Sequence, residues 1–190
     1  MSLGRIREVE IRARVAPRMS RFRIRLATLR DLDVLVHHRR RMWEEMGESD
    51  QVELDAADTV YRRWARQRMK TRRLIGFILE DAKGRAVASG CVWLRPMQPR
   101  PGRPMRPVPY LLSMFTEPDS RGRGLATRIV REALRWCKDH EYPRLTLHAS
   151  ARGRSLYRRL GFRNTWEMRI KLSPPKLGGS HKRRKRVTSS

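Results

Sequence analysis

The sequence predicts a mixed α/β (α+β) domain, and two observations carry that prediction. Strand-like and helix-like hydrophobic patterns follow one another in the order β, α, α, β, β, β, α, β, α, β. A glycine-rich turn at 121–124 stands between an apolar run at 110–116 and an amphipathic helical pattern. A chain of 190 residues with 39% hydrophobic residues and five tryptophans suits one domain with a modest core and tails.

Alternating residues predict strands, and apolar residues spaced by three or four predict helices. The predicted elements are a strand at 22–26, a helix from 32 to near Gly47, a helix over 57–65, strands at 74–79, 86–94 and 110–116, a helix over 124–140, a short strand at 145–147, a helix around Tyr157 and a strand over 165–172. Thr28 to Asp31 resembles a capping box with Asp in place of the usual Glu. Residues 81–84 are a predicted hairpin turn, and the proline-rich stretch 96–109 is a predicted loop.

The two ends of the chain differ in composition from its middle. Residues 1–20 are expected to be a basic N-terminal extension, in which alternating apolar residues hint at an extra strand. Met1 and Met19 are both candidate natural starts. Residues 21–172 are expected to form the folded domain. Residues 173–190 contain prolines, glycines and the basic run 182–186, which predicts a disordered basic tail.

The turn Arg121-Gly122-Arg123-Gly124-Leu125-Ala126 is the most informative part of the chain. A glycine-rich turn before a helix presents backbone N–H groups and the positive end of the helix dipole, which together bind phosphate. The turn lacks the Gly-Lys-Ser/Thr ending of a P-loop. It also has Thr127 where a dinucleotide-binding turn requires Gly or Ala. The prediction is therefore a phosphate-bearing ligand held at about residues 121–127.

Two segments resemble the GNAT superfamily of acyl-CoA-dependent N-acetyltransferases. Arg121, Gly124 and Ala126 match its Gln/Arg-x-x-Gly-x-Gly/Ala signature. About thirty residues further on, the segment 156–162 is similar to the family's Leu-Tyr-x-x-x-Gly-Phe, and Gly161 stands where a helix C-cap requires a left-handed residue. The two motifs occur in the family's order and spacing. The resemblance covers residues 22–172 in element order and 108–168 in motif detail.

The resemblance implies a fold, a co-substrate and a reaction. The fold is a mixed, mostly antiparallel sheet with helices on both faces, splayed at an acyl-CoA cleft. The reaction is direct transfer of an acetyl group from acetyl-CoA to a primary amine of an unidentified acceptor. The expected contacts to acetyl-CoA come from Leu112, Met114, Arg121, Gly122, Arg123, Gly124, Leu125, Ala126, Thr127, Ser150 and Tyr157.

By the same resemblance, two residues are expected to act in catalysis. The backbone N–H of Leu112 is placed at the thioester carbonyl, where a hydrogen bond stabilises the developing charge. Tyr157 matches the family's general acid for the departing thiolate. Met114 is expected to pair with the pantetheine arm. Ser150 stands where many members have Asn, so its assignment departs from the family pattern.

The general base stays open between Glu117, His148 and a water relay. Some members use a Glu at the position of Val108, so no residue carries over there. No metal is implied, because the adjacent His37 and His38 are expected to diverge in direction on a helix.

A net charge of +26, from 45 Lys+Arg and 19 Asp+Glu, favours either an arginine bias spread over the surface or a nucleic-acid partner. The alternative function is a basic RNA- or ribosome-associated protein that has this fold without catalysis. The basic tail is the candidate for weak nucleic-acid contact. No apolar run approaches bilayer length, and Cys91 and Cys137 fit small buried hydrophobes, so we expect a cytoplasmic protein with no membrane contact. A homodimer is one alternative for its oligomeric state.

Overall fold

The structure is a computed structural model that describes residues 22–99, 101–102 and 105–170. It contains a five-stranded sheet in the order β1-β2-β3-β4-β5, with every neighbouring pair antiparallel except β4 and β5. The strands are β1 (Phe22–Leu26), β2 (Leu74–Asp81), β3 (Ala86–Arg95), β4 (Val108–Thr116) and β5 (Thr146–Leu147). The helices are η2 (Leu29–Asp31), α2 (Leu32–Glu45), α3 (Gln51–Lys70), η3 (Pro118–Ser120), α4 (Leu125–Asp139) and α5 (Arg154–Arg159).

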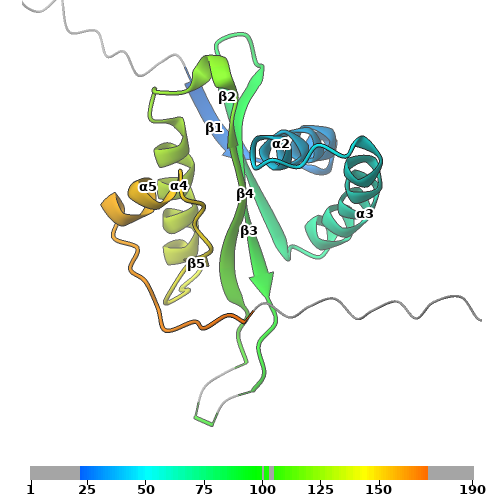
Figure 1. The fold of residues 1–190 in the computed structure, drawn as a ribbon. Coiled ribbons are helices and arrows are strands. Elements are labelled where there is room, and N and C mark those ends of the chain that lie inside the picture. Colours follow the sequence, from blue (N-terminus) through cyan, green and yellow to red (C-terminus); the bar gives the residue numbers. More distant parts are fainter. Residues whose placement is uncertain (1–21, 100, 103–104, 171–190) are drawn as a thin grey trace, which may run out of the picture.

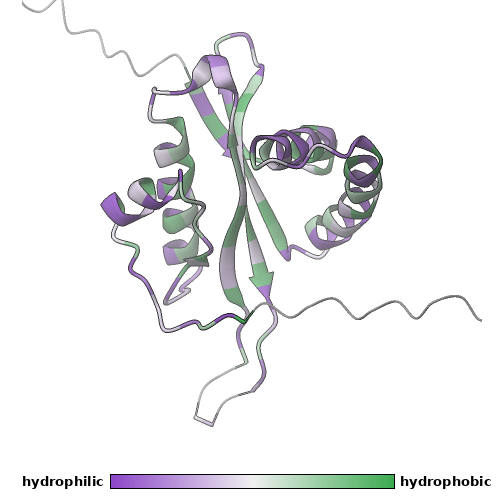
Figure 2. Ribbon diagram, viewed as in Figure 1, coloured by the Kyte–Doolittle hydropathy of each residue, from purple (hydrophilic) through white to green (hydrophobic). Residues whose placement is uncertain are grey.

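The sheet separates two hydrophobic clusters, one on each face. Helices α4 and α5 cover one face, and α2 and α3 cover the other (Figure 1). The cluster under α4 includes Phe77, Leu111 and Ile129, and the cluster under α2 and α3 includes Leu35, Ile78 and Cys91. Figure 2 shows hydrophobic residues along the central strands, which are covered on both faces. The predicted mixed sheet with helices on both faces is confirmed.

Local signals in the sequence mark the ends of several elements as predicted. The Thr28 hydroxyl accepts a hydrogen bond from Arg30 N–H, and the Asp31 carboxylate accepts one from Thr28 N–H at 2.7 Å. This confirms the capping box, although it opens η2 before α2. At the other end of the domain, Gly161 has φ +89° and follows α5 as a left-handed C-cap.

One predicted strand is absent from the described residues, and one predicted loop is too long. The predicted strand over 165–172 is absent among its described residues, because 163–170 are neither helix nor strand. Strand β5 is only two residues long, so its edge offers few backbone groups for a further strand to pair with. The predicted loop 96–109 is shorter than expected, because Val108 and Pro109 already pair with β3. The predictions of an N-terminal extension at 1–20 and of a basic tail at 173–190 concern segments outside the described residues.

Strand β4 contains one residue more than the strand opposite. Cys91 pairs with Leu112 and Ser89 pairs with Phe115, so only Gly90 lies opposite the two residues between them. Ser113 has φ +52°, the left-handed conformation of a bulge residue. The bulge interrupts the alternation of side chains.

His38 joins α2 to the strands on either side of this bulge. Its side chain is 2% exposed, and its Nδ1 lies 2.9 Å from the hydroxyl of Ser89 on β3. Its Nε2 lies 3.4 Å from Oε1 of Glu117, just after β4, and its ring packs on Phe115. Burial, with a smaller effect of the neighbouring His37, lowers the pKa of His38 from 6.5 to about 4.

We predict that Gly90→Ala destabilises the protein by about 1–3 kcal/mol, the usual cost of overpacking. A Cβ at Gly90 would lie 2.3 Å from Sδ of Met114 and 2.9 Å from Cγ2 of Ile129. Chemical denaturation measures the loss. The control is the same substitution in a Met114→Ala background, where it should cost less because the sulfur is gone. Equal costs in both backgrounds would contradict the close approach.

The lowered pKa of His38 predicts a pH dependence of stability. Below about pH 6.5 the unfolded chain takes up a proton that folded His38 accepts only near pH 4. Stability is therefore lost as pH falls through this window, by at most ~3 kcal/mol for this residue. His38→Gln should flatten the loss, measured as the unfolding free energy at pH 7 and pH 4.5. The exposed His140→Gln is the control, and a wild-type slope in His38→Gln would refute the prediction.

Candidate active site

The glycine-rich turn lies between η3 and the first turn of α4. Gly122 and Gly124 both have φ +73°, which residues with a side chain rarely adopt. No described atom lies within 4 Å of the place where a Cβ would stand on either glycine. The turn is therefore exposed and has space above its backbone, as a close approach to an anion requires.

The N-terminus of α4 faces this space without a side-chain cap. Gly124 is the N-cap residue, and it has no side chain with which to accept a hydrogen bond. The first N–H groups of a helix have no partner within the helix, so those of Leu125, Ala126 and Thr127 can serve a ligand. Leu125 is 2% exposed and anchors this turn in the core. The chemistry of this backbone fits a phosphate or pyrophosphate.

The two arginines of the turn are held by neighbouring protein groups. Arg121 donates from Nε to the carbonyl of Thr116 at 3.0 Å and forms an ion pair with Glu45 of α2. Arg123 donates to the carbonyl of Asp119 at 3.3 Å. These contacts brace both ends of the turn. The expected role of the two side chains in binding acetyl-CoA stays a prediction.

The bulge gives Leu112 and Met114 opposite environments. Leu112 packs with the cluster under α2 and α3, and Met114 packs with the cluster under α4. In a regular strand, residues two apart share a face. The extra residue Ser113 thus turns β4 over at the position where the resemblance places the thioester.

Strands β4 and β5 separate next to the bulge. Only two residue pairs join them, Tyr110 with Thr146 and Leu111 with Leu147. Beyond Leu111, residues 112–116 of β4 continue without β5 beside them (Figure 1). Strand β4 then runs through η3 to the glycine-rich turn before α4, so this part of its backbone is connected directly to the N–H groups that are expected to bind the anion. The predicted splay of the sheet corresponds to this opening.

Tyr157 and Ser150 lie close together at the start of α5. A Cβ on Gly153 would be 3.0 Å from the Tyr157 ring and 3.3 Å from the Ser150 hydroxyl oxygen. Tyr157 is half-buried, with its ring edge-on to Phe162, and burial raises the pKa of its phenol. Ser150 accepts a hydrogen bond from Gly153 N–H at 3.2 Å, which leaves its O–H available as a donor. Their roles toward acetyl-CoA stay predictions.

The two candidate bases lie in different surroundings. Glu117 is at the loop end of β4, and its Oε1 lies within 3.6 Å of Nε2 of both His37 and His38. The two histidines therefore converge on one carboxylate, contrary to the expected divergence. His148 directly follows β5, at the point where β4 and β5 separate. Its ring contacts Tyr110 and Glu167, two residues that sequence reasoning did not single out.

A second group missed in the sequence lies between α2 and α3. Three buried polar atoms have no hydrogen-bond partner among the described residues: Arg39 Nη1, Asp58 Oδ1 and the Tyr61 hydroxyl. The Arg39 guanidinium lies 4.5 Å above the Tyr61 ring. Burial raises the pKa of Tyr61 and lowers that of Arg39. Helical spacing had marked Tyr61 only as a core residue.

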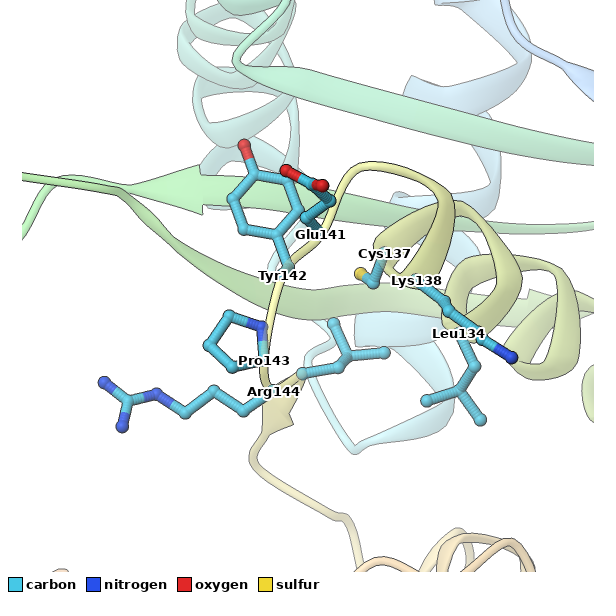
Figure 3. A pocket seen from close by; sticks show the side chains of 8 residues that line it. Leu134, Cys137, Lys138, Glu141, Tyr142, Pro143 and Arg144 are labelled. Carbon is cyan, nitrogen blue, oxygen red and sulfur yellow. The ribbon is translucent and has the colours of Figure 1, made fainter. Parts of the chain in front are cut away.

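Two shallow hollows lie away from the glycine-rich turn. One, of about 400 Å³, is lined by the end of α4 and the segment that follows it. Figure 3 shows that Lys138 and Arg144 extend from it in different directions, so their charges do not converge on one ligand. The other, of about 510 Å³, lies over Arg25 and Asp31, which already pair with each other.

The described residues contain neither a membrane-spanning helix nor a cluster of metal ligands. No helix among them combines the length and apolar character needed to cross a bilayer. No three His, Cys, Asp or Glu side chains among them are grouped as metal ligands. Cys91 and Cys137 are both buried and unpaired, as small apolar side chains would be, and burial raises their thiol pKa values to about 12 and about 11.

Comparisons with known proteins agree with this geometry. The family model described as "Acetyltransferase (GNAT) family" matches residues 34–162. A GCN5-related N-acetyltransferase from Ralstonia eutropha JMP134 superposes with a TM-score of 0.71 at 26% identity, over 80% of this chain and 98% of that one. A predicted acetyltransferase from Clostridium acetobutylicum, solved with acetyl-CoA, gives 0.70 at 25% identity, over 80% and 96%.

A more distant structure shares the fold. The aminoglycoside N-acetyltransferase AAC(6')-Iy, in complex with a bisubstrate analogue, has a TM-score of 0.61 at 22% identity, over 82% of this chain and 99% of that one. No curated protein matched the chain. The family model spans the turn before α4, the splayed strands and α5. The chain therefore belongs to the GNAT acetyltransferase family and is an acyl-CoA N-acetyltransferase.

Proposed function

We propose that the protein transfers an acetyl group directly from acetyl-CoA to a primary amine. The observation that carries this proposal is the uncapped N-terminus of α4 beside the opening between β4 and β5. A pyrophosphate bound by the N–H groups of residues 122–127 would allow a pantetheine arm to follow β4 inward. Leu112 N–H then meets the thioester carbonyl, and Met114 pairs with the arm.

Tyr157 is the proposed acid of this reaction. It belongs to the face of the sheet that α4 and α5 cover, the side from which the glycine-rich turn presents its N–H groups. Its raised pKa keeps the phenol protonated at neutral pH, as a donor to a departing thiolate must be. The Ser150 hydroxyl, next to the Tyr157 ring, is the proposed donor to the pantetheine arm.

The acceptor is proposed to approach from the face covered by α2 and α3. The buried polar atoms of Arg39, Asp58 and Tyr61 lie on that face, and an acceptor there would reach Leu112 from the side opposite Tyr157. A thiol-release assay across simple amines, aminoglycosides and peptides tests the function. Aminoglycosides enter the panel because one fold neighbour acts on them. Absence of thiol release with every acceptor would favour the non-catalytic RNA-associated alternative.

The proposal extends to the domain boundaries, the location, the assembly and the nucleic-acid contact of the protein. The boundaries of the catalytic domain are 21–172. The protein is cytoplasmic, and a homodimer is an open alternative for its assembly. Contact with nucleic acid, if the +26 charge serves it, comes from the tail 173–190, which lies outside the described residues.

Gly124→Glu is predicted to abolish CoA binding, because it places a carboxylate where the pyrophosphate would lie. Gly84→Glu is a matched control, since Gly84 also has a positive φ, +79°, and open space around it, but lies in the hairpin turn after β2. Calorimetric titration with CoA gives the affinities. Unchanged affinity in Gly124→Glu, or equal losses in both variants, would remove the turn from the site.

Tyr157→Phe is predicted to lower kcat by about 10²-fold, as expected for the loss of a positioned acid. Its affinity for CoA should hardly change, because the ring that packs on Phe162 remains. Steady-state kinetics with an acceptor found in the panel measures the effect, with Tyr142→Phe as the control at the remote hollow. A kcat equal to that of the wild type would leave Tyr157 a structural residue.

A further inference from the structure

Three polar side chains form a line at the point where β4 and β5 separate. The Tyr110 hydroxyl is hydrogen-bonded to Nδ1 of His148, and Nε2 of His148 lies 2.6 Å from Oε1 of Glu167. The residues come from β4, from the end of β5 and from the segment after α5. Each ring nitrogen of His148 therefore has its own partner.

The line lies on the face of the sheet opposite Tyr157. Leu111 and Leu147 pair with each other and both pack with the cluster under α4. Their neighbours Tyr110 and His148 therefore point to the other face, because side chains alternate along a strand. Tyr110 also lies opposite Trp93, which packs with the cluster under α2 and α3. This is the face that the proposed acceptor uses.

The partners of His148 define its tautomer. A carboxylate only accepts hydrogen bonds, so Nε2 carries the hydrogen that is donated to Glu167. In the neutral ring, Nδ1 is then the acceptor, and the Tyr110 hydroxyl donates to it. The unprotonated nitrogen of His148 thus faces the phenol, and a carboxylate stands behind the ring to stabilise a positive charge. The hydrogen bond from His148 also lowers the pKa of Glu167, so the carboxylate stays charged.

Among the described residues, Arg95 and Arg169 also contact these three side chains. The guanidinium of Arg95, at the end of β3, lies 4.9 Å above the Tyr110 ring. Arg169 lies 3.5 Å from the same Glu167 oxygen that His148 contacts. Arg169 helps to lower the pKa of Glu167 and so holds this carboxylate in its charged form. The His148 side chain is 43% exposed, so a proton that it takes up can leave to solvent.

We propose that Tyr110, His148 and Glu167 form the proton relay that serves as general base in this acetyltransferase. The assignment rests on the proposed transfer to an amine. As the amine nitrogen bonds to the thioester carbon and the C–S bond breaks, the nitrogen loses a proton to the Tyr110 oxygen. Tyr110 passes its own proton to Nδ1 of His148, and the thiolate takes a proton from Tyr157. His148 then releases its proton to solvent, and Tyr157 regains one.

The position of this relay favours it over Glu117 as the base. Tyr110 lies two residues before Leu112 on β4 and on the same face of the sheet, and the N–H of Leu112 is the proposed donor to the thioester. Glu117 lies five residues after Leu112, just past the end of β4 and beyond the bulge, and its carboxylate faces His37 and His38. In the relay, Tyr110 is the catalytic residue, whereas His148 and Glu167 act through it.

The pH dependence of kcat tests the relay. The wild type should gain activity with rising pH over part of the range from about 5 to 8, where histidines titrate. His148→Gln should lower kcat by about 10²-fold near neutral pH and lose this rise. Glu167→Gln should move the rise to lower pH, because a less stabilised imidazolium loses its proton more readily, and Glu167→Asp should restore part of the wild-type profile. Tyr110→Phe should lower kcat as His148→Gln does.

The controls separate the relay from the rest of the proposed function. Calorimetry should give wild-type CoA affinity for His148→Gln, since the relay lies on the acceptor face. Glu141→Gln, an exposed carboxylate near Arg106, should leave the pH profile unchanged. A wild-type kcat and profile in His148→Gln would overturn the relay, as would a loss of CoA affinity that accounts for the whole loss of activity. Failure of the proposed function differs from both, because the wild type itself would then release no thiol.

Discussion

Strand β4 has to accommodate one residue more than β3 offers opposite it, and much of the site depends on that mismatch. Ser113 takes up the extra length in a left-handed conformation, and Gly90 leaves the space that Met114 fills. The side chains of β4 change faces there, so the strand meets the core under α4 before the bulge with Leu111 and after it with Met114. A regular β4 would hold the same residues in a continuous ladder and would present a different row of side chains to each helix layer.

Strand β4 separates from β5 next to the bulge, and this separation leaves the backbone that the proposed site uses without a neighbouring strand. A parallel pair of only two residues ends at Leu111, so the backbone of β4 next to the bulge lacks a strand on that side. The first turn of α4 ends the same opening with N–H groups that no side chain caps. Both features are made of backbone. They explain why the side chains at 112, 114 and 124 can be apolar or absent in a site that is expected to bind a polyanion.

The sequence predicted the glycine conformations and the capping box well because each depends on a local rule, whereas the bulge in β4 was not predicted and the splay followed only from the resemblance. Gly122, Gly124 and Gly161 adopt the left-handed conformations that their positions required. Thr28 caps the start of η2, as its spacing from Asp31 indicated. Contacts between distant segments could not be predicted in this way. Nothing near His148 indicates that it would meet a residue thirty-eight positions before it and another nineteen positions after it. A strand was predicted over 165–172, but a strand also needs an edge to pair with, and β5 offers only two residues.

The sheet separates the residue proposed as the acid from the residue proposed as the base. Tyr157 belongs to the face covered by α4 and α5, where the thiol of the donor would leave, and Tyr110 belongs to the face where an amine would arrive. Burial raises the pKa of the Tyr157 phenol, which suits it to donate a proton, whereas the Tyr110 phenol is hydrogen-bonded to an imidazole to which it can pass a proton. We propose that two tyrosines can thus serve opposite steps, because they lie on opposite faces of the sheet and have different surroundings.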